Sequence, residues 1–201
     1  MRSDQIANIL IADRFCLFQG PESFAVKGDY LYTGVQGGDI LRININDPKT
    51  PWEFVTKIGS LCSASHQEEI CGRPLGLEFD KDGNLIVSDA YYGLYKVNLE
   101  TDEKIPLVPS NVDIDGKRNR LTNSLTLSKD SKTIYYTVSS TNFLLHNGMY
   151  EFMTMPSGRV IKYDMYGNMS KVIKLIQLLI FLIKTQGFPK IWLLIRIFKE
   201  S

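Results

Sequence analysis

Three short β-forming runs recur along the chain at intervals of about 50 residues, and this repeat constrains the fold more than any other feature. The runs cover residues 31–34, 85–89 and 134–137, so their starts lie 54 and 49 residues apart. A turn rich in Lys, Asp, Gly or Ser precedes each run, and a Gly-led apolar strand follows it. Repeats of this length that hold several strands are typical of β-propeller blades. The sequence therefore predicts an all-β protein that forms part of a propeller, with about three to three and a half blades.

The repeats divide the chain into three parts. Residues 1–16 form an N-terminal segment, residues 17–172 the partial propeller, and residues 173–201 a divergent tail that is apolar and basic.

A propeller removes its open edges by closing into a ring, usually of about four to eight blades. Open blades are therefore expected to self-associate through their exposed strand edges. A compact sandwich of about twelve strands is the alternative fold for the same runs.

Composition excludes several classes of protein. Of the 201 residues, 44% are hydrophobic and 22% charged, which excludes disordered and collagen-like sequences. Three Cys residues are too few for a disulfide-rich scaffold. The formal net charge of +1 gives no overall field that would attract nucleic acid, so no nucleic-acid partner is expected.

The sequence shows neither a signal peptide nor a spanning segment. The apolar run at 9–12 is too short for a signal peptide, and the run at 172–183 stays below the roughly 18 apolar residues of a membrane-spanning helix. Residues 171–201 carry six Lys or Arg and one acid. We predict that the tail is an unrelated extension from a truncated or misjoined reading frame. The alternative is a basic amphipathic segment that associates with a membrane surface.

Six motifs follow one another in a fixed order over residues 17–172. They are Gly-Pro-Glu-Ser-Phe at 20–24, Leu-Tyr-Thr-Gly-Val-Gln-Gly-Gly-Asp-Ile at 31–40, Cys-Gly-Arg-Pro-Leu-Gly-Leu at 71–77, Val-Ser-Asp-Ala-Tyr-Tyr-Gly-Leu at 87–94, Leu-Thr-Asn-Ser-Leu-Thr-Leu at 121–127 and Gly-Arg-Val-Ile-Lys-Tyr-Asp at 158–164. This set resembles the N-terminal half of the strictosidine synthase-like family, and most closely its animal branch of adipocyte plasma membrane-associated and hemomucin-like proteins. The resemblance implies a six-bladed β-propeller with a metal or substrate site where the blades converge.

The resemblance also implies that Glu22 and Asn123 are ligands of a central Ca²⁺ ion. A hard cation takes several oxygen ligands, which different blades can supply at the propeller axis. From residue type alone, Glu22 would cap a turn and Asn123 would satisfy strand-end amides. The family often has Asp where this chain has Ser124 and Val138, so the ligand set of the expected calcium site is incomplete.

The sequence does not identify catalytic residues. His66 and His146 are predicted to be surface residues, and no Gly-x-Ser-x-Gly motif occurs. The resemblance places Leu75 where related lactonase propellers have a catalytic His. The glutamate that serves true strictosidine synthases lies beyond the matching region, so strictosidine synthase activity is not expected. Asp89, at a strand end, is predicted to accept hydrogen bonds from the following turn, which is a structural role.

The resemblance implies a disulfide between Cys62 and Cys71, because the family commonly pairs cysteines in this loop. Such a bond indicates an oxidising compartment, and hence the secretory pathway, the plasma membrane or the cell exterior. Cys16 would remain a free thiol, and two unrelated thiols in the loop are the alternative. Asn168-Met169-Ser170 is an N-glycosylation sequon.

The function implied by the resemblance is hydrolysis of a small ester or lactone by a calcium-dependent arylesterase or lactonase. A non-catalytic, hemomucin-like surface binding module is one alternative. An inactive fragment is the other.

Overall fold

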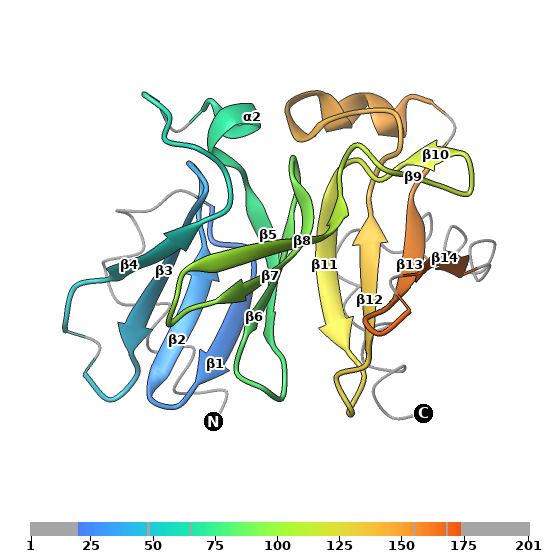
Figure 1. Cartoon of the computed structure of the whole chain (residues 1–201). Helices are drawn as coiled ribbons and strands as arrows, with labels where there is room; N and C mark the ends of the chain where they lie inside the picture. The colour runs from blue at the N-terminus through green and yellow to red at the C-terminus, as the bar shows by residue number, and fades with distance from the viewer. Residues whose placement is uncertain (1–19, 48, 65, 155, 168, 174–201) are drawn as a thin grey trace.

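The computed structural model describes residues 20–173 except 48, 65, 155 and 168, and these residues contain three four-stranded antiparallel sheets (Figure 1). Within each sheet the strands follow one another in chain order. The first sheet consists of β1 (Phe24–Lys27), β2 (Tyr30–Gly34), β3 (Asp39–Asn44) and β4 (Glu53–Lys57). The second consists of β5 (Pro74–Phe79), β6 (Leu85–Asp89), β7 (Gly93–Asn98) and β8 (Glu103–Pro109). The third consists of β11 (Thr122–Leu127), β12 (Thr133–Val138), β13 (Arg159–Asp164) and β14 (Met169–Ile173).

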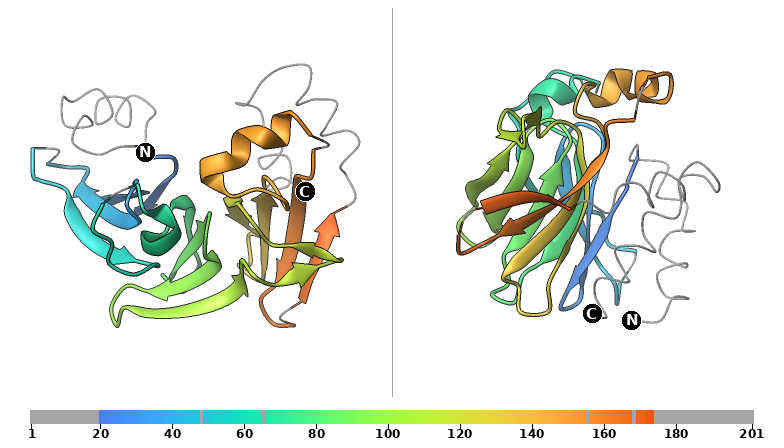
Figure 2. Two further views of the ribbon diagram at one scale, coloured as in Figure 1. Left: turned by 90° about the horizontal axis from the view of Figure 1, so that it is seen from above. Right: turned by 90° about the vertical axis from the view of Figure 1, so that its right-hand side faces the viewer.

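The repeat in the sequence corresponds to these sheets. The three predicted runs lie in the second strand of each sheet, β2, β6 or β12, and the Gly-led runs lie in the third strand, β3, β7 or β13. The sheets stand side by side in an arc rather than a closed ring (Figure 2). The predicted all-β partial propeller is therefore confirmed, with three blades in the described residues. The sandwich alternative is wrong, because the main strands form three sheets and not two.

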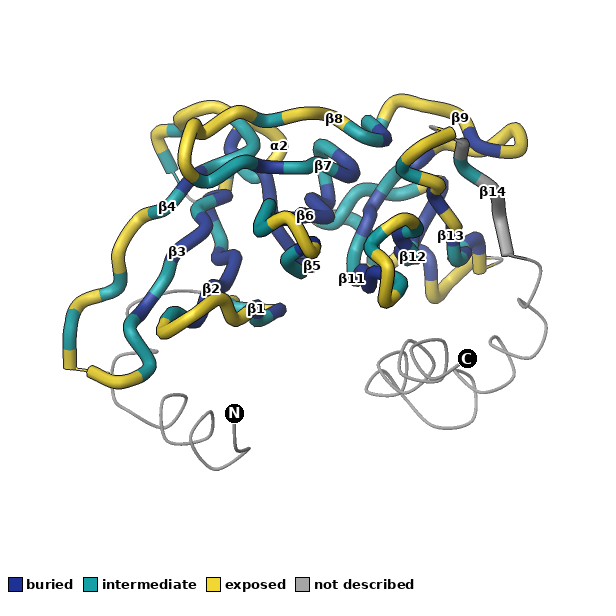
Figure 3. Tube along the Cα trace, turned by 60° about the horizontal axis from the view of Figure 1, so that its bottom comes forward, coloured by how far each residue is buried: buried dark blue, intermediate teal, exposed yellow. Residues whose placement is uncertain are grey.

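The core lies between the blades, and β6 shows why. All five residues of β6 are buried (Figure 3). Successive side chains of a strand point to opposite faces of the sheet. Leu85 and Val87 accordingly pack with residues of the first blade, whereas Ile86 packs with residues of the third. Burial of each of these aliphatic side chains contributes about 1.5–3 kcal/mol to the hydrophobic stabilisation.

The first strands of the blades are neighbours. β5 packs between β1 and β11. All three strands begin at the end of the sheets that carries two short helices, α2 (Glu68–Cys71) and the 3-10 helix η2 (Leu145–Phe152) (Figure 1). We name this end the upper end and the opposite end the lower end.

Two connections between strands lie at the upper end. The insertion that the sequence places at about 141–157 contains η2. A small hairpin of β9 (Asp113–Ile114) and β10 (Lys117–Arg118) precedes the third blade. The buried Arg159 guanidinium holds it by donating to the carbonyl oxygens of Ile114, Lys117 and Arg118 at 2.5–3.0 Å.

Several sequence-based predictions fall outside the described residues: the N-terminal segment with Cys16, the sequon residue Asn168, and the tail from residue 174 onward. Among the residues that the structure describes, no helix is long and apolar enough to cross a membrane.

Candidate functional site

The predicted ligands Glu22 and Asn123 lie at the upper end, on either side of β5. Ser23, next to Glu22, accepts a hydrogen bond at its Oγ from the backbone N–H of Leu77 at 3.3 Å. On the other side, β11 approaches so closely that a Cβ placed on Gly76 would lie 2.7 Å from the Asn123 carbonyl oxygen. Ser23 and Asn123 therefore lie against neighbouring residues of β5, Leu77 and Gly76, and Glu22 precedes Ser23 in the chain. The fold brings them to one region although 100 residues separate them in the sequence.

The environment of Asn123 orients its side-chain amide. The Nδ2 group donates to Ser139 Oγ at 3.1 Å, and the backbone carbonyl oxygen accepts a hydrogen bond from Ser88 Oγ. Since the amide nitrogen is used by Ser139, the oxygen Oδ1 is the atom that would bind a cation.

Arg73 connects the acidic groups around this region. Its backbone N–H donates to Asp89 Oδ2 at 2.8 Å, and its guanidinium Nη2 donates to the Gly20 carbonyl oxygen at 2.7 Å. The same Nη2 lies 3.9 Å from Glu22 Oε1, and Nε lies 3.7 Å from Glu68 Oε1. The Arg73 side chain is 8% exposed, while that of Glu22 is 53% exposed. The buried guanidinium thus lies beside the carboxylates of Glu22 and Glu68, while the Asp89 carboxylate accepts from the backbone N–H of the same residue.

Asp89 is fully buried and closes the turn between β6 and β7. Its Oδ1 accepts hydrogen bonds from the backbone N–H groups of Tyr91 and Tyr92, at 2.9 and 3.1 Å, and its Oδ2 accepts from Arg73. Burial raises the pKa of Asp89 to about 6, although these three N–H groups favour the ionised form. The contacts agree with the structural role predicted for Asp89.

Glu68 and the insertion complete the upper end. Burial raises the pKa of Glu68, while the Arg73 charge and a hydrogen bond with Tyr91 act in the opposite direction. His146 Nδ1, on η2, lies 3.0 Å from Glu69 Oε1, on α2, so this contact joins the insertion of the third blade to the connection that precedes the second blade. The predicted surface positions agree with the structure, because His146 is half-exposed and His66 is exposed.

The insertion is held by a second buried carboxylate. Glu151 accepts hydrogen bonds from the hydroxyls of Ser140 and Ser157, at 2.5 and 2.6 Å, and from the backbone N–H of Ser157. Neighbouring apolar side chains of the same segment remain in solvent, and Met149 and Met153 are 75% and 81% exposed.

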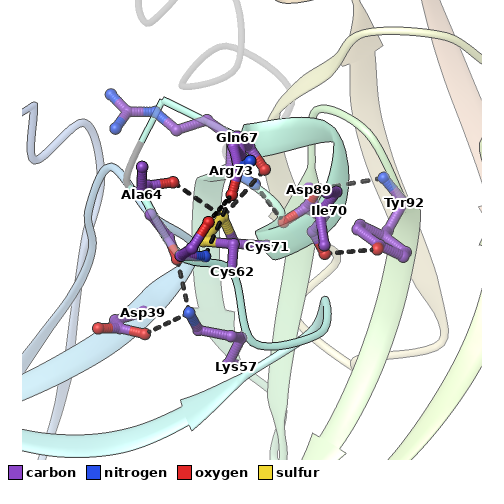
Figure 4. Close-up of a disulfide and its surroundings, with 12 residues drawn as sticks. Asp39, Lys57, Cys62, Ala64, Gln67, Ile70, Cys71, Arg73, Asp89 and Tyr92 are labelled. Carbon is purple, nitrogen blue, oxygen red and sulfur yellow. Dashed lines mark hydrogen bonds and ion pairs between the residues drawn. A yellow bond between two sulfur atoms is a disulfide. The ribbon is translucent and has the colours of Figure 1, made fainter.

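The structure contains the predicted disulfide between Cys62 and Cys71, whose Cα atoms are 5.4 Å apart (Figure 4). The loop that it closes packs on the first blade, where Gly38 and Gly59 leave no room for a side chain against the Cys71 carbonyl. Tyr92 donates its hydroxyl to the Ile70 carbonyl oxygen at 2.8 Å, which ties the loop to the second blade (Figure 4).

Sequence reasoning missed Arg73 as the residue that joins these groups. Its motif, residues 71–77, carried the family resemblance, but nothing in the sequence distinguishes a buried guanidinium from an exposed one. Within the described part of the chain, no three His, Cys, Asp or Glu side chains come together as a metal site. The expected catalytic position, Leu75, is a buried core residue that packs with Ala90 and Leu121.

Comparisons with known proteins show what this chain resembles. Residues 18–43 match the family model described as strictosidine synthase-like, N-terminal. The chain is 40% identical over 159 residues to the hemomucin form of adipocyte plasma membrane-associated protein from Drosophila melanogaster, and 34% identical over 156 residues to the human adipocyte plasma membrane-associated protein. The resemblance to the strictosidine synthase-like family is confirmed. Each match covers 77% of this chain, but only 27% of the fly protein and 36% of the human protein.

The chain spans 27–40% of the length of the strictosidine synthase-like relatives reported for it. A solved structure of an oligogalacturonate lyase from Vibrio parahaemolyticus superposes with a TM-score of 0.50 and 15% sequence identity. That superposition covers 77% of this chain and 40% of the lyase. At this identity the likeness shows the fold alone.

Proposed function

We propose that this chain supplies part of the central site of a calcium-dependent strictosidine synthase-like propeller that hydrolyses small esters or lactones. The observation that carries the proposal is that Asn123 and Ser23, the neighbour of Glu22, lie against adjacent residues of β5, while Glu22 itself lies 3.9 Å from the Arg73 guanidinium. Glu22 and Asn123 provide oxygen ligands, and the carboxylates of Glu22 and Glu68 outnumber the one guanidinium between them, both of which favour a hard cation.

The residues fit calcium as a partial ligand set. Glu22 would contribute carboxylate oxygens and Asn123 its amide oxygen, whereas Ca²⁺ takes about six to eight oxygens in proteins. The remaining ligands would come from water and from the blades that longer relatives have in addition. A bound cation would polarise the carbonyl group of an ester or lactone.

The chain's own residues would prepare this site rather than perform the bond cleavage. Ser139 fixes the Asn123 amide so that its oxygen is available, and Gly76 permits β11 to come close to β5. Glu22 is held only loosely by Arg73 at 3.9 Å, so turning toward a cation sacrifices little interaction energy. In the overall reaction, water adds to the acyl carbon and the bond to the alcohol oxygen breaks.

The test is turnover of phenyl acetate by the full chain with calcium and with a chelator. The proposal predicts calcium-dependent hydrolysis that Glu22→Gln abolishes. Asp130→Asn is a matched control, because it makes the same acid-to-amide change at an exposed position near the lower end. Equal turnover in chelator, or unchanged turnover in Glu22→Gln, would contradict the proposal.

A non-catalytic binding module is the second candidate, and the position of Leu75 favours it. The side chain where related lactonases have His is here a buried leucine, and His146 is engaged with Glu69. Saturable calcium binding without any ester turnover would support this candidate over the hydrolase.

We also propose that the chain functions in an oxidising compartment such as the secretory pathway or the cell surface. The disulfide between Cys62 and Cys71 supports this, since such bonds persist mainly outside the cytosol. The names of the relatives, which describe association with a plasma membrane, point the same way. Counting free thiols in protein isolated from cells tests it: reduced Cys62 and Cys71 would contradict it.

A further inference from the structure

The insertion of the third blade contains the one Asn-Gly pair of the sequence, Asn147-Gly148. In such a pair the glycine backbone nitrogen can attack the side-chain carbonyl carbon of the asparagine, because glycine has no Cβ that obstructs the approach. The pair lies within η2, where Asn147 departs from helical geometry with φ −122° and ψ 17°. Both residues are half-buried, and Met149 and Tyr150, which follow them, are 75% and 56% exposed. Solvent therefore has access to this stretch of chain.

Two hydrogen bonds of the same turn hold the Asn147 side chain in place. The backbone N–H of Leu144 donates to Asn147 Oδ1 at 2.9 Å, and the backbone N–H of Asn147 donates to the Leu144 carbonyl oxygen at 3.2 Å. A backbone N–H aimed at a carbonyl oxygen stabilises the negative charge that develops there when a nucleophile adds to the carbon. The turn thus polarises the amide carbonyl of Asn147 for attack by the nitrogen of the following residue, Gly148.

Asn142 provides a contrast within the same insertion. It is more exposed than Asn147, so solvent access alone would favour its modification. The residue after it is Phe143, however, whose Cβ and ring stand beside the backbone nitrogen that would have to attack. Asn142 is therefore an internal reference for Asn147, with the same solvent and the same segment but an obstructed nucleophile.

We propose that Asn147 is a site of spontaneous deamidation, and that this modification loosens the insertion from the upper end. The Gly148 nitrogen forms a bond to the side-chain carbonyl carbon of Asn147, and the bond from that carbon to the amide nitrogen breaks. Ammonia leaves with the proton that the backbone nitrogen gives up. Water then opens the cyclic imide at one of its two carbonyl carbons. The product is an aspartate or an isoaspartate, in which the side-chain carbons have become part of the backbone.

Isoaspartate affects the insertion because it adds one atom to the backbone between two anchors. On one side of Asn147, Leu145 packs with the buried Leu75 and Leu121. On the other side, the Glu151 carboxylate accepts hydrogen bonds from two serine hydroxyls. A longer backbone between these fixed points disturbs the packing or the hydrogen bonds. The backbone amides of η2 should then open to solvent more often.

The test incubates the full chain in neutral buffer and follows residues 133–159, which cleavage after Lys and Arg releases as one peptide. We expect a mass gain of one dalton that fragmentation places at Asn147 and not at Asn142, with labelling by protein isoaspartyl methyltransferase at the same residue. Gly148→Ala is the matched variant, because among the described residues a Cβ at this position meets only Leu121 Cδ2, at 3.6 Å. It should slow the gain about tenfold, which corresponds to about 1.4 kcal/mol in the barrier.

A synthetic peptide of residues 143–151 sets the time scale. An unmodified Asn147 in the folded chain after the peptide has converted would overturn the proposal, as would equal rates in the parent chain and in Gly148→Ala. The comparison with Asn142 needs no variant, and equal modification of both asparagines would also overturn it. Hydrogen exchange tests the loosening: the amides of residues 144–152 should exchange faster in the modified chain, and unchanged exchange would contradict that part. None of these outcomes depends on the proposed calcium site.

Discussion

The two ends of the second blade each contain a buried aspartate, and the pKa values of the two aspartates shift in opposite directions. Asp89 closes the upper turn after β6, and Asp80 closes the lower turn after β5. Both accept hydrogen bonds from backbone N–H groups of their own turns. Burial raises the pKa of Asp89 to about 6. Burial also acts to raise the pKa of Asp80, but hydrogen bonds from Asn84 and the Lys96 ammonium outweigh it and hold that pKa below its ordinary value.

The difference comes from the neighbouring groups, since hydrogen bonds from Asn84 lower the pKa of Asp80 most and the Lys96 ammonium lowers it further. Lys96 Nζ lies 3.1 Å from Asp80 Oδ2, whereas the groups near Asp89 include the further carboxylate of Glu68, which raises its pKa. At the lower end, the buried carboxylate of Asp80 is therefore paired with a cation. The upper end keeps an excess of carboxylates around Arg73, which is the condition that a cation-binding site requires.

The largest expected effect is the pH dependence of stability that the buried Asp89 contributes. Its folded pKa of about 6 lies above the ordinary 3.8, so the folded chain takes up this proton before the unfolded chain does. The contribution of Asp89 to stability is then fully present below pH 3.8 and lost as the pH rises through about 6. A displacement of this size corresponds to about 3 kcal/mol.

Urea unfolding of the parent chain and of Asp89→Asn between pH 4 and 7.5 measures this effect. The destabilisation caused by the substitution should shrink as the pH rises. A constant difference across that interval would show that the Asp89 pKa is not raised.

Next in size is the destabilisation by Asp89→Asn at pH 7.5, for which we expect about 2 kcal/mol. Both carboxylate oxygens accept from backbone N–H groups, so the NH₂ group of Asn must face at least one donor. Chemical denaturation measures the loss, with Asp82→Asn as an exposed control in the same blade. A loss equal to that of the control would contradict the described hydrogen bonds.

Asp80→Asn should have a smaller effect, about 1 kcal/mol at pH 7.5. The backbone N–H groups of Asp82 and Asn84 both donate to Oδ1, which an Asn side chain retains. The pH dependence should be the reverse of that at Asp89. Because the folded pKa is lowered, the contribution of Asp80 is present at neutral pH and lost as the pH falls through the folded pKa. A larger loss of stability than in Asp89→Asn would contradict the difference described between the two ends of the blade.

Lys96→Met should have the smallest effect on stability, about 0.5–1 kcal/mol, because the ammonium is partly exposed. It should nevertheless make the lower end resemble the upper one by raising the pKa of Asp80. Carboxyl NMR titration of Asp80 measures this directly, and an unchanged pKa in the variant would show that Lys96 is not the cause.

Much of the fold was predictable because its signals are local or periodic. Turn residues and β-rich runs repeat along the chain, and an aspartate at a strand end before a turn indicates the role of Asp89. The pairing of Cys62 with Cys71 followed from family resemblance. The remaining features depend on contacts between segments that are distant in sequence. Neither the burial of Arg73 against Gly20 nor the pairing of Asp80 with Lys96 leaves a pattern in the sequence.

The insertion at about 141–157 was also only partly predictable from the sequence. Its approximate position follows from the longer third repeat, but the Glu151 side chain that holds it against Ser140 and Ser157 has no sequence signature. The candidate calcium ligands were also only partly predictable. The family resemblance indicated Glu22 and Asn123, but only the arrangement of the blades shows that their segments approach one stretch of β5.

Calcium titration of the full chain by isothermal calorimetry, with Glu22→Gln, Asn123→Ala and the double variant, decides whether the upper end is a cation site. We predict saturable binding, with a dissociation constant on the order of a millimolar or below, that each single substitution weakens by roughly tenfold or more. Asp82→Asn, at the lower end, should leave the isotherm unchanged. No saturable binding, or the same affinity in the parent chain and the double variant, would contradict the assignment of Glu22 and Asn123 to one site.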